Sequence, residues 1–170
     1  MATNISRVSR FVRKFPMIDY GKPVRIEMGC GDNKHRHPER KEGWYGMDIV
    51  DYGQEIIWDM EENLPFPDKS VDEIYSSHTF EHISNLVGLM NECWRILKDE
   101  GKLYIIVPHK DNEKAYIPSH VNHFDKFSWM FFEYRGVETD YFVKPWIIEE
   151  IIVNERPDIH VKMKPKREEE

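Results

Sequence analysis

The stretch Val24-Arg-Ile-Glu-Met-Gly-Cys-Gly-Asp-Asn33 decides how this sequence folds. Its apolar first half, Val24–Met28, predicts a short buried strand. The strand runs directly into Gly29 and Gly31, whose lack of a Cβ lets the backbone pass close to a ligand. Taken alone, two glycines at this spacing also fit an ordinary tight turn. The residues at the ends of the following strands distinguish a ligand-binding turn from an ordinary one.

The next two predicted strands both end in acidic residues. Tyr45–Val50 carries Asp48, 17 residues after the second glycine, where a carboxylate can accept hydrogen bonds from the hydroxyls of a ribose. Glu55–Met60 ends in Asp59, which can accept from an adenine amino group, and in Met60, which can pack on the adenine ring. These strand ends indicate a site for an adenosine-containing ligand.

The chain continues with strands and helical stretches in alternation. Val71–Ser77 and Lys102–Val107 are predicted strands, and apolar residues at helical spacing predict a helix over residues 84–98 between them. Nearly continuous apolar strands separated by helices or long connections predict a mostly parallel sheet covered on both faces. The expected fold is a three-layer α/β/α Rossmann-like sandwich, with its ligand beyond the carboxyl ends of the strands where the strand order reverses.

The flanking segments predict smaller elements. A helix is expected over residues 5–15, because Ile5, Val8, Phe11, Val12 and Phe15 would share one of its faces. Residues 109–125 form a polar connection, and residues 126–135 are aromatic and predicted to be helical. Phe142–Asn154 and Asp158–Lys164 alternate in polarity and predict a final antiparallel pair, followed by a tail over residues 165–170.

Length and composition exclude several classes of protein. A chain of 170 residues that is 40% hydrophobic suits one domain with a real core and excludes a disordered chain. No apolar run approaches the roughly 18 residues of a membrane span, and basic residues stand where a secretory signal would be apolar. The distant Cys30 and Cys93 suit free thiols in a reducing compartment. We therefore expect a cytoplasmic protein without a membrane partner.

The charge is unevenly distributed along the chain. The formal net charge is −7, although the first 45 residues hold ten Lys and Arg against five Asp and Glu. A basic segment could meet an anionic substrate or nucleic acid, or it could be the solvated face of an amphipathic helix. The acidic whole disfavours broad binding to nucleic acid, and a small-molecule partner is expected.

Two further stretches complete a family pattern. They read Leu64-Pro-Phe-Pro-Asp-Lys-Ser-Val-Asp-Glu-Ile-Tyr-Ser-Ser-His-Thr-Phe-Glu-His82 and Trp94-Arg-Ile-Leu-Lys-Asp-Glu-Gly-Lys-Leu-Tyr-Ile-Ile-Val-Pro108. With the strand ends above, and in this order, the chain resembles class I S-adenosylmethionine-dependent methyltransferases, in a compact branch like methyltransferase type 11. The resemblance implies a single domain over residues 1–170. It has an N-terminal helix within 1–20, a cofactor-binding core over 24–108 and an acceptor-side region over 109–164.

The resemblance also implies S-adenosylmethionine as the cofactor and names the residues that would contact it. The first motif would hold the methionine portion, Asp48 the ribose hydroxyls, and Asp59 with Met60 the adenine. Ser77 and His78 would face the methionine amino group and the methyl sulfonium. The implied contacts are Glu27, Met28, Gly29, Cys30, Gly31, Asp48, Ile49, Asp59, Met60, Ser77 and His78. The segment Asp32–Gly43 is shorter than is usual for the family and carries Pro38.

Histidines offer a rival interpretation, because the chain holds eight of them. His78-Thr-Phe-Glu-His82 matches the H-x-x-E-H pattern, in which two histidines on one helical face bind zinc and Glu81 acts as a base. The motif follows the predicted strand Val71–Ser77 directly, however. A sequence of this kind is common after the fourth strand in similar methyltransferases. A metal-dependent hydrolase is therefore the less favoured alternative.

A second group of histidines follows the last parallel strand. His109, Asp111, His120 and His123 could together bind a metal ion or supply a general base, or they could cap backbone groups in a loop. The sequence assigns no metal site there.

The expected function is methyl transfer to a small-molecule or sugar hydroxyl or amine, with His78, His109 and His120 as candidate bases. Nucleic acid is less favoured, because Ser76-Ser-His-Thr79 replaces the Asn-Pro-Pro-Tyr-like stretch used at planar base nitrogens. A cofactor-binding module without turnover is the alternative. The aromatic stretch Trp129–Tyr134 could form a lid or a homodimer interface, but core packing is expected.

Overall fold

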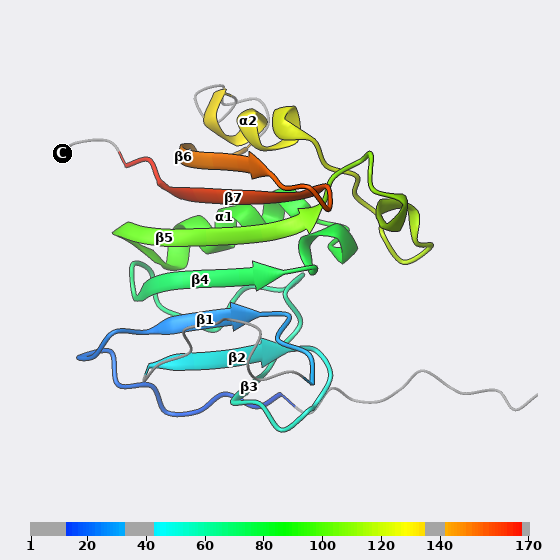
Figure 1. Cartoon of the computed structure of the whole chain (residues 1–170). Helices are drawn as coiled ribbons and strands as arrows, with labels where there is room; N and C mark the ends of the chain where they lie inside the picture. The colour runs from blue at the N-terminus through cyan, green and yellow to red at the C-terminus, as the bar shows by residue number, and fades with distance from the viewer. Residues whose placement is uncertain (1–12, 33–42, 135–141, 168–170) are drawn as a thin grey trace, which may run out of the picture.

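A seven-stranded mixed sheet organises the chain, in the strand order β3-β2-β1-β4-β5-β7-β6 (Figure 1). The computed structural model describes residues 13–32, 43–134 and 142–167. Strands β1 to β5 pair in parallel, and β7 lies antiparallel to both β5 and β6. The predicted α/β fold, mostly parallel with an antiparallel C-terminal strand, is confirmed.

The strands are β1 Arg25–Met28, β2 Trp44–Asp48, β3 Ile56–Ile57, β4 Val71–Ser77, β5 Leu97–Pro108, β6 Trp146–Val153 and β7 Asp158–Pro165. Helix α1 spans Leu86–Ile96, helix α2 spans Lys126–Tyr134, and two short 3-10 helices are η1 Phe80–His82 and η2 Glu113–Tyr116. Each element predicted between residues 24 and 108 is present. The third strand is shorter than expected and β5 starts five residues earlier, directly after α1.

The N-terminal helix predicted over residues 5–15 is wrong for the part of it that the structure describes. Lys14 instead forms an isolated antiparallel bridge with Ile57, whose backbone N–H donates to the Lys14 carbonyl at 2.9 Å. Strand β3 is the edge of the sheet, and its unpaired backbone groups attract an extended segment. The rest of that helix and most of the polar segment 32–43 lie outside the described residues.

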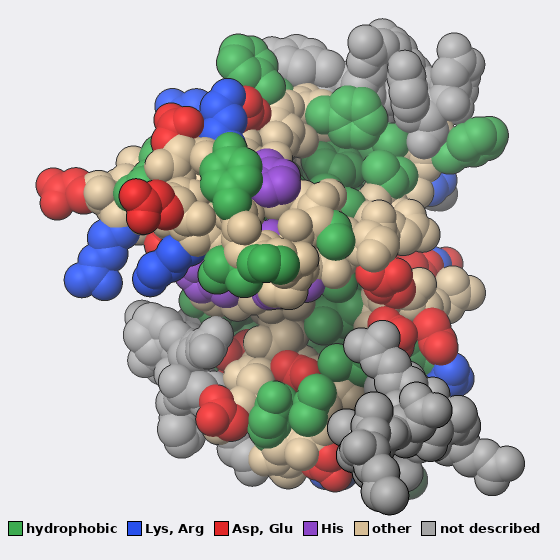
Figure 2. Space-filling view, turned by 90° about the vertical axis from the view of Figure 1, so that its right-hand side faces the viewer, with side chains coloured by type: hydrophobic (Ala, Val, Ile, Leu, Met, Phe, Trp, Pro, Cys, Tyr) green, Lys and Arg blue, Asp and Glu red, His purple; other side chains and the backbone are tan. Residues whose placement is uncertain are grey.

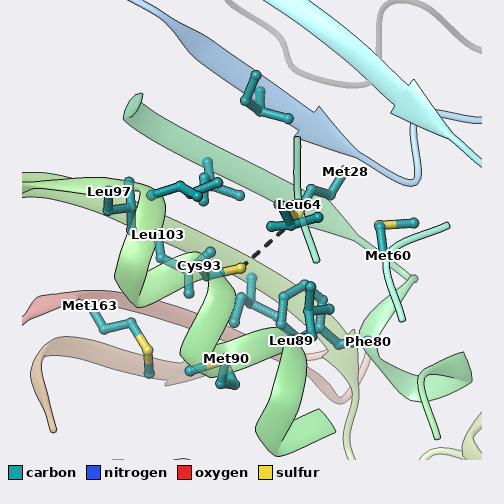
Figure 3. Packing of buried hydrophobic residues seen from close by; sticks show 14 of the residues in the cluster. Met28, Met60, Leu64, Phe80, Leu89, Met90, Cys93, Leu97, Leu103 and Met163 are labelled. Atoms are coloured by element: carbon teal, nitrogen blue, oxygen red, sulfur yellow. Dashed lines mark hydrogen bonds between the residues drawn. The ribbon is translucent and has the colours of Figure 1, made fainter. Parts of the chain in front are cut away.

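Helix α1 covers one face of the sheet and builds the core with it (Figures 1 and 3). Its buried residues are Leu89, Met90, Cys93 and Ile96. The Cys93 sulfur lies 4.0 Å from the sulfur of Met28 on β1. Burial raises the pKa of the Cys93 thiol well above its ordinary value, so this thiol stays protonated and unreactive.

Helix α2 lies beside β6 at the far edge of the sheet (Figure 1). Trp129 and Phe132 on this helix are buried, and Trp129 stacks on Phe124 with ring centroids 4.9 Å apart. Core packing is therefore the main use of the aromatic stretch. Neither α-helix in the described ranges is long and apolar enough to cross a membrane.

The turn that follows β3 is fixed to α1 by one arginine. The Arg95 guanidinium donates hydrogen bonds to the carbonyls of Leu64 and Phe66, to Asp68 and to Glu92, at 2.7–2.9 Å. Glu92 also accepts a 2.7 Å bond from the Leu64 backbone N–H. The hydrogen bond from Arg95 holds the pKa of Glu92 below its usual 4.5.

We expect Glu92→Gln to destabilise the protein at neutral pH but not in acid. Hydrogen bonds to charged groups contribute about 1.5–3 kcal/mol each, so a loss of roughly 1–2 kcal/mol is expected. Because the folded pKa is lowered, this stabilisation is complete above the usual value of 4.5 and disappears as the pH falls through the folded pKa. Urea unfolding from pH 7 to about pH 3.5 measures it. Exposed Glu113→Gln is the control, and a pH-independent difference contradicts the prediction.

Candidate functional site

A pocket of about 380 Å³ opens at the carboxyl ends of the parallel strands. It lies at the reversal in strand order, since β1 has β2 on one side and β4 on the other. We call it the switch-point pocket, and its lining residues are Gly29, Asp48, Ile49, Asp59, Met60, Glu61, His78, Thr79, His82 and Ile83. Histidine and acidic side chains gather at this end of the molecule (Figure 2). Its volume is within the range of small-ligand sites.

Gly29 forms the floor of the pocket, directly after β1. Its φ is +67°, and its backbone N–H donates to the Met47 carbonyl at 2.8 Å. A Cβ at this position would lie 2.0 Å from Thr79 Oγ1, so a side chain cannot be accommodated. The position requires glycine for two separate reasons, its backbone conformation and the close approach of Thr79.

Asp48 stands at the tip of β2 and shapes the glycine turn. One carboxylate oxygen accepts from the Gly31 N–H at 2.9 Å, and the other accepts from the Val50 N–H at 3.0 Å. A carboxylate has about four lone-pair sites. Two acceptor sites therefore remain for a ligand that offers hydroxyl donors.

The segment after β3 supplies the acidic wall of the pocket. Asp59 accepts from the Glu61 N–H at 2.9 Å, and Glu61 accepts from the Ser84 N–H at 2.6 Å. Met60 is buried and turns apolar surface toward the pocket. An apolar surface beside a carboxylate suits a flat heterocycle with an amino group.

His78 follows β4 and lines the pocket. Its backbone N–H donates to the Ile106 carbonyl at 2.8 Å, and its φ is +54°, which a histidine rarely adopts. The imidazole Nδ1 lies 3.4 Å from Glu81 Oε1, and 41% of the His78 side chain is exposed while Glu81 is buried. A carboxylate behind an accessible imidazole is a common arrangement for a general base.

The structure brings six of the predicted cofactor contacts together in this pocket. They are Gly29, Asp48, Ile49, Asp59, Met60 and His78. The other five, Glu27, Met28, Cys30, Gly31 and Ser77, are not among its lining residues. Glu27, Met28 and Cys30 are buried at 2% exposure or less. The side chains of Met28 and Cys30 belong to the core.

The other two candidate bases lie outside the described lining of the pocket. His109 follows β5, and its Nδ1 accepts from the Asp111 N–H at 3.1 Å. The His120 ring packs edge-on against His82, with centroids 4.6 Å apart. Of the three candidates, His78 therefore has the best placement for chemistry in the pocket.

Sequence reasoning missed four lining residues, Glu61, Thr79, His82 and Ile83. Glu61 directly follows Met60, and Thr79 directly follows His78. His82 and Ile83 come after the short turn that follows His78. The helix required by the H-x-x-E-H interpretation is also absent in this segment. His78 precedes η1, and only Phe80–His82 form that single 3-10 turn. His78 and His82 consequently do not share a helical face.

Comparisons with known proteins agree with this geometry. Residues 26–105 match the family model described as a methyltransferase domain. The methyltransferase YcgJ of Bacillus subtilis is 34% identical over 65 residues, which cover 38% of this chain and 25% of that protein. The matches span between 22% and 36% of the length of the curated relatives.

Solved structures show the same fold at low identity. A protein of Sulfolobus solfataricus assigned to type 11 methyltransferases has a TM-score of 0.61 at 24% identity, covering 88% of this chain and 87% of its own. A SAM-dependent methyltransferase from Aquifex aeolicus has a TM-score of 0.62 at 19% identity, covering 85% and 82%. The chain therefore has the fold of class I methyltransferases. Over residues 26–105, just under half of its length, the chain matches the methyltransferase domain family.

Proposed function

We propose that this protein binds S-adenosylmethionine in the switch-point pocket and transfers its methyl group to a hydroxyl or amine of a small molecule or sugar. The observation that carries the proposal is the pairing of Gly29, which has no room for a Cβ, with the carboxylate of Asp48 in one pocket. A close backbone approach and an acidic strand tip are the two requirements of an adenosyl site at a switch point.

The pocket residues fit the chemical groups of this cofactor. Asp48 has free acceptor sites for ribose hydroxyls, and Met60 with Asp59 offers an apolar surface and an acceptor for the adenine. Gly29 leaves backbone exposed for the methionine portion. When bound, S-adenosylmethionine supplies a methyl group that is already activated on a sulfonium sulfur. The protein mainly has to position the acceptor, which can contribute roughly 7–11 kcal/mol.

The acceptor would enter beside His78, at the open side of the pocket. A hydroxyl or protonated amine has to lose a proton, and His78 is placed to take it, with the Glu81 carboxylate 3.4 Å from its ring. Asp48, Asp59 and Glu61 make the lining acidic, and the net charge is −7. This charge opposes a phosphate backbone and favours a small neutral or cationic acceptor.

A thermal melt with S-adenosylhomocysteine tests cofactor binding. At 100 times its dissociation constant, a ligand stabilises the folded state by about 2.7 kcal/mol, a shift of about 5–10 °C for a chain of this size. Asp48→Ala removes an acceptor worth about 1.5–3 kcal/mol for each bond, so affinity should fall roughly 10- to 1,000-fold.

Asp51→Ala is the matched control for that variant. Asp51 is an exposed carboxylate three residues on, which accepts from the Gly53 N–H at 2.8 Å and does not line the pocket in the described structure. We expect it to keep wild-type affinity. No melting shift with either adenosyl compound would refute the cofactor assignment. Binding followed by no transfer to a panel of hydroxyl and amine acceptors would instead favour a non-catalytic module.

A further inference from the structure

We propose that Glu81, His82 and His120 bind a divalent transition-metal ion, of which Zn²⁺ is the representative, beside the switch-point pocket. One ligand atom from each of these residues lies within 4.8 Å of the others. Two imidazole nitrogens and one carboxylate oxygen form a donor set that suits Zn²⁺ and related ions. The proposal rests on this cluster and does not require the methyltransferase activity.

Glu81 is the strongest indication that a positive charge is missing from the cluster. Its side chain is 1% exposed, and neither carboxylate oxygen accepts a hydrogen bond from any described residue. The His78 Nδ1 atom lies 3.4 Å from Oε1. Burying an ionised carboxylate without hydrogen bonds is costly, and a bound cation would offset that cost.

His82 has the hydrogen bond that is typical of a metal-ligating histidine. Its Nδ1–H donates to the Ser119 carbonyl at 3.0 Å, which leaves Nε2 as the ring nitrogen available to a metal ion. His120 contributes a second unsatisfied group, because its Nδ1 is buried without a hydrogen-bond partner in the described structure. A buried imidazole nitrogen of this kind is itself a candidate ligand atom.

The loop that carries His120 is fixed to η1 by several hydrogen bonds. The Glu81 carbonyl accepts from the N–H groups of Val121 at 2.8 Å and Asn122 at 3.1 Å. The Asn122 amide donates to the carbonyls of Phe80 and Ile83 at 3.2 and 2.6 Å. The three proposed ligands are therefore held together by the backbone, as a preorganised site requires.

The geometry also indicates which kind of metal site this is. An ion about 2.0–2.2 Å from each ligand atom keeps those atoms about 3–4 Å apart, and the atoms of this cluster all lie within 4.8 Å of one another. Three protein ligands leave a coordination position open for water or another ligand. His82 also lines the switch-point pocket, so the proposed metal site lies next to that pocket.

Zn²⁺ titration of the full chain, stripped with a chelator and assayed against a chromophoric competitor, tests the site directly. We expect one tightly bound equivalent in the wild type and at least a roughly 100-fold loss of affinity in His82→Ala and His120→Ala. His123→Ala is the control, because His123 lies in the same loop but stacks on Tyr116. Wild-type protein without a stoichiometric site, or an equal loss in His123→Ala, would overturn the proposal.

Glu81→Gln provides a second readout that does not depend on activity. In metal-free protein this variant should melt at or above the wild-type temperature, because it removes a buried charge without hydrogen bonds. With excess Zn²⁺ the wild type should melt several degrees higher, and Glu81→Gln should show little shift. Equal Zn²⁺ shifts in both proteins would show that Glu81 is not a ligand.

Discussion

Gly29→Ala is expected to abolish measurable binding of S-adenosylhomocysteine. The new Cβ would lie 2.0 Å from Thr79 Oγ1 and 2.7 Å from Thr79 Cγ2, distances that folded proteins do not tolerate. The residue would also have to keep a φ of +67°, which costs an L-residue about 1–2 kcal/mol. Either the glycine turn or Thr79 has to move, and a displacement of about 1 Å can reduce function roughly 100-fold.

Two variants separate the clash from the backbone strain. Gly31→Ala has a comparable φ of +57°, but its Cβ would meet no described atom within 4 Å. Its affinity for S-adenosylhomocysteine should fall only because of the backbone strain, so this variant should still bind the ligand. In Gly29→Ala/Thr79→Gly the obstructing side chain is removed, so affinity should recover in part while the strain remains.

Isothermal titration with S-adenosylhomocysteine measures the affinity of these variants, and circular dichroism shows whether each one is folded. Overpacking adds about 1–3 kcal/mol to the strain, so Gly29→Ala should also melt at a lower temperature. Wild-type affinity in a folded Gly29→Ala protein would remove Gly29 from the cofactor site. Equal losses in Gly29→Ala and Gly31→Ala would show that the contact with Thr79 has no special role.

The strand ends of this site were predictable from the sequence because parallel strands present their carboxyl ends at one edge of the sheet. Once Val24–Met28 and Val71–Ser77 are identified as strands of one parallel sheet, Gly29 and His78 are expected at the same edge of that sheet. The observed register supports this, since Met28 pairs with Ser76. Asp48 follows from the same rule applied to β2.

The boundaries that the prediction missed depend on contacts distant in the sequence. Strand β5 starts at Leu97 because Leu97 pairs with Val71, and the Lys98 ammonium forms an ion pair with Asp72 at 2.8 Å. The polar run 98–101 gives no sign of this partner. Lys14 likewise extends toward the edge of β3, where backbone pairing outweighs the helical spacing of its neighbours.

The cluster of Glu81, His82 and His120 could not be predicted from sequence spacing, because it also depends on contacts distant in the sequence. Sequence spacing pairs His78 with His82 and His120 with His123, whereas the fold places His120 against His82. Backbone hydrogen bonds between Glu81 and the loop at Val121 create this contact. A local pattern does not contain such information, because the two segments are about 40 residues apart.

His78→Asn is expected to lower kcat by roughly 100- to 10,000-fold, the usual contribution of a general base. Asparagine is chosen because it tolerates the positive φ of +54° at this position, so the loss reports on the imidazole and not on the backbone. Affinity for S-adenosylhomocysteine should stay within about threefold, because 41% of the His78 side chain faces solvent and the backbone contacts are kept.

The assay follows S-adenosylhomocysteine release with the best acceptor from a screen of small hydroxyl and amine compounds. A chelator is present throughout, because Glu81 belongs to the proposed metal site and also lies 3.4 Å from the His78 ring, so a bound ion would change the surroundings of His78. Added imidazole should restore part of the turnover of His78→Asn, since the variant lacks only the proton acceptor. A structural defect would not respond to imidazole, and this response distinguishes a base from a residue that merely shapes the pocket.

Three outcomes assign the proton acceptor among the candidate histidines. A large loss in His78→Asn that imidazole rescues, with smaller losses in His109→Ala and His120→Ala, supports His78 as the base. A selective loss in His109→Ala moves that role to the end of β5, where Asp111 contacts the ring. Unchanged turnover in all three variants rules out an imidazole base, and the acceptor must then arrive deprotonated or lose its proton to water. Transfer would in that case depend on positioning alone, for which Gly29 and Asp48 already supply the geometry.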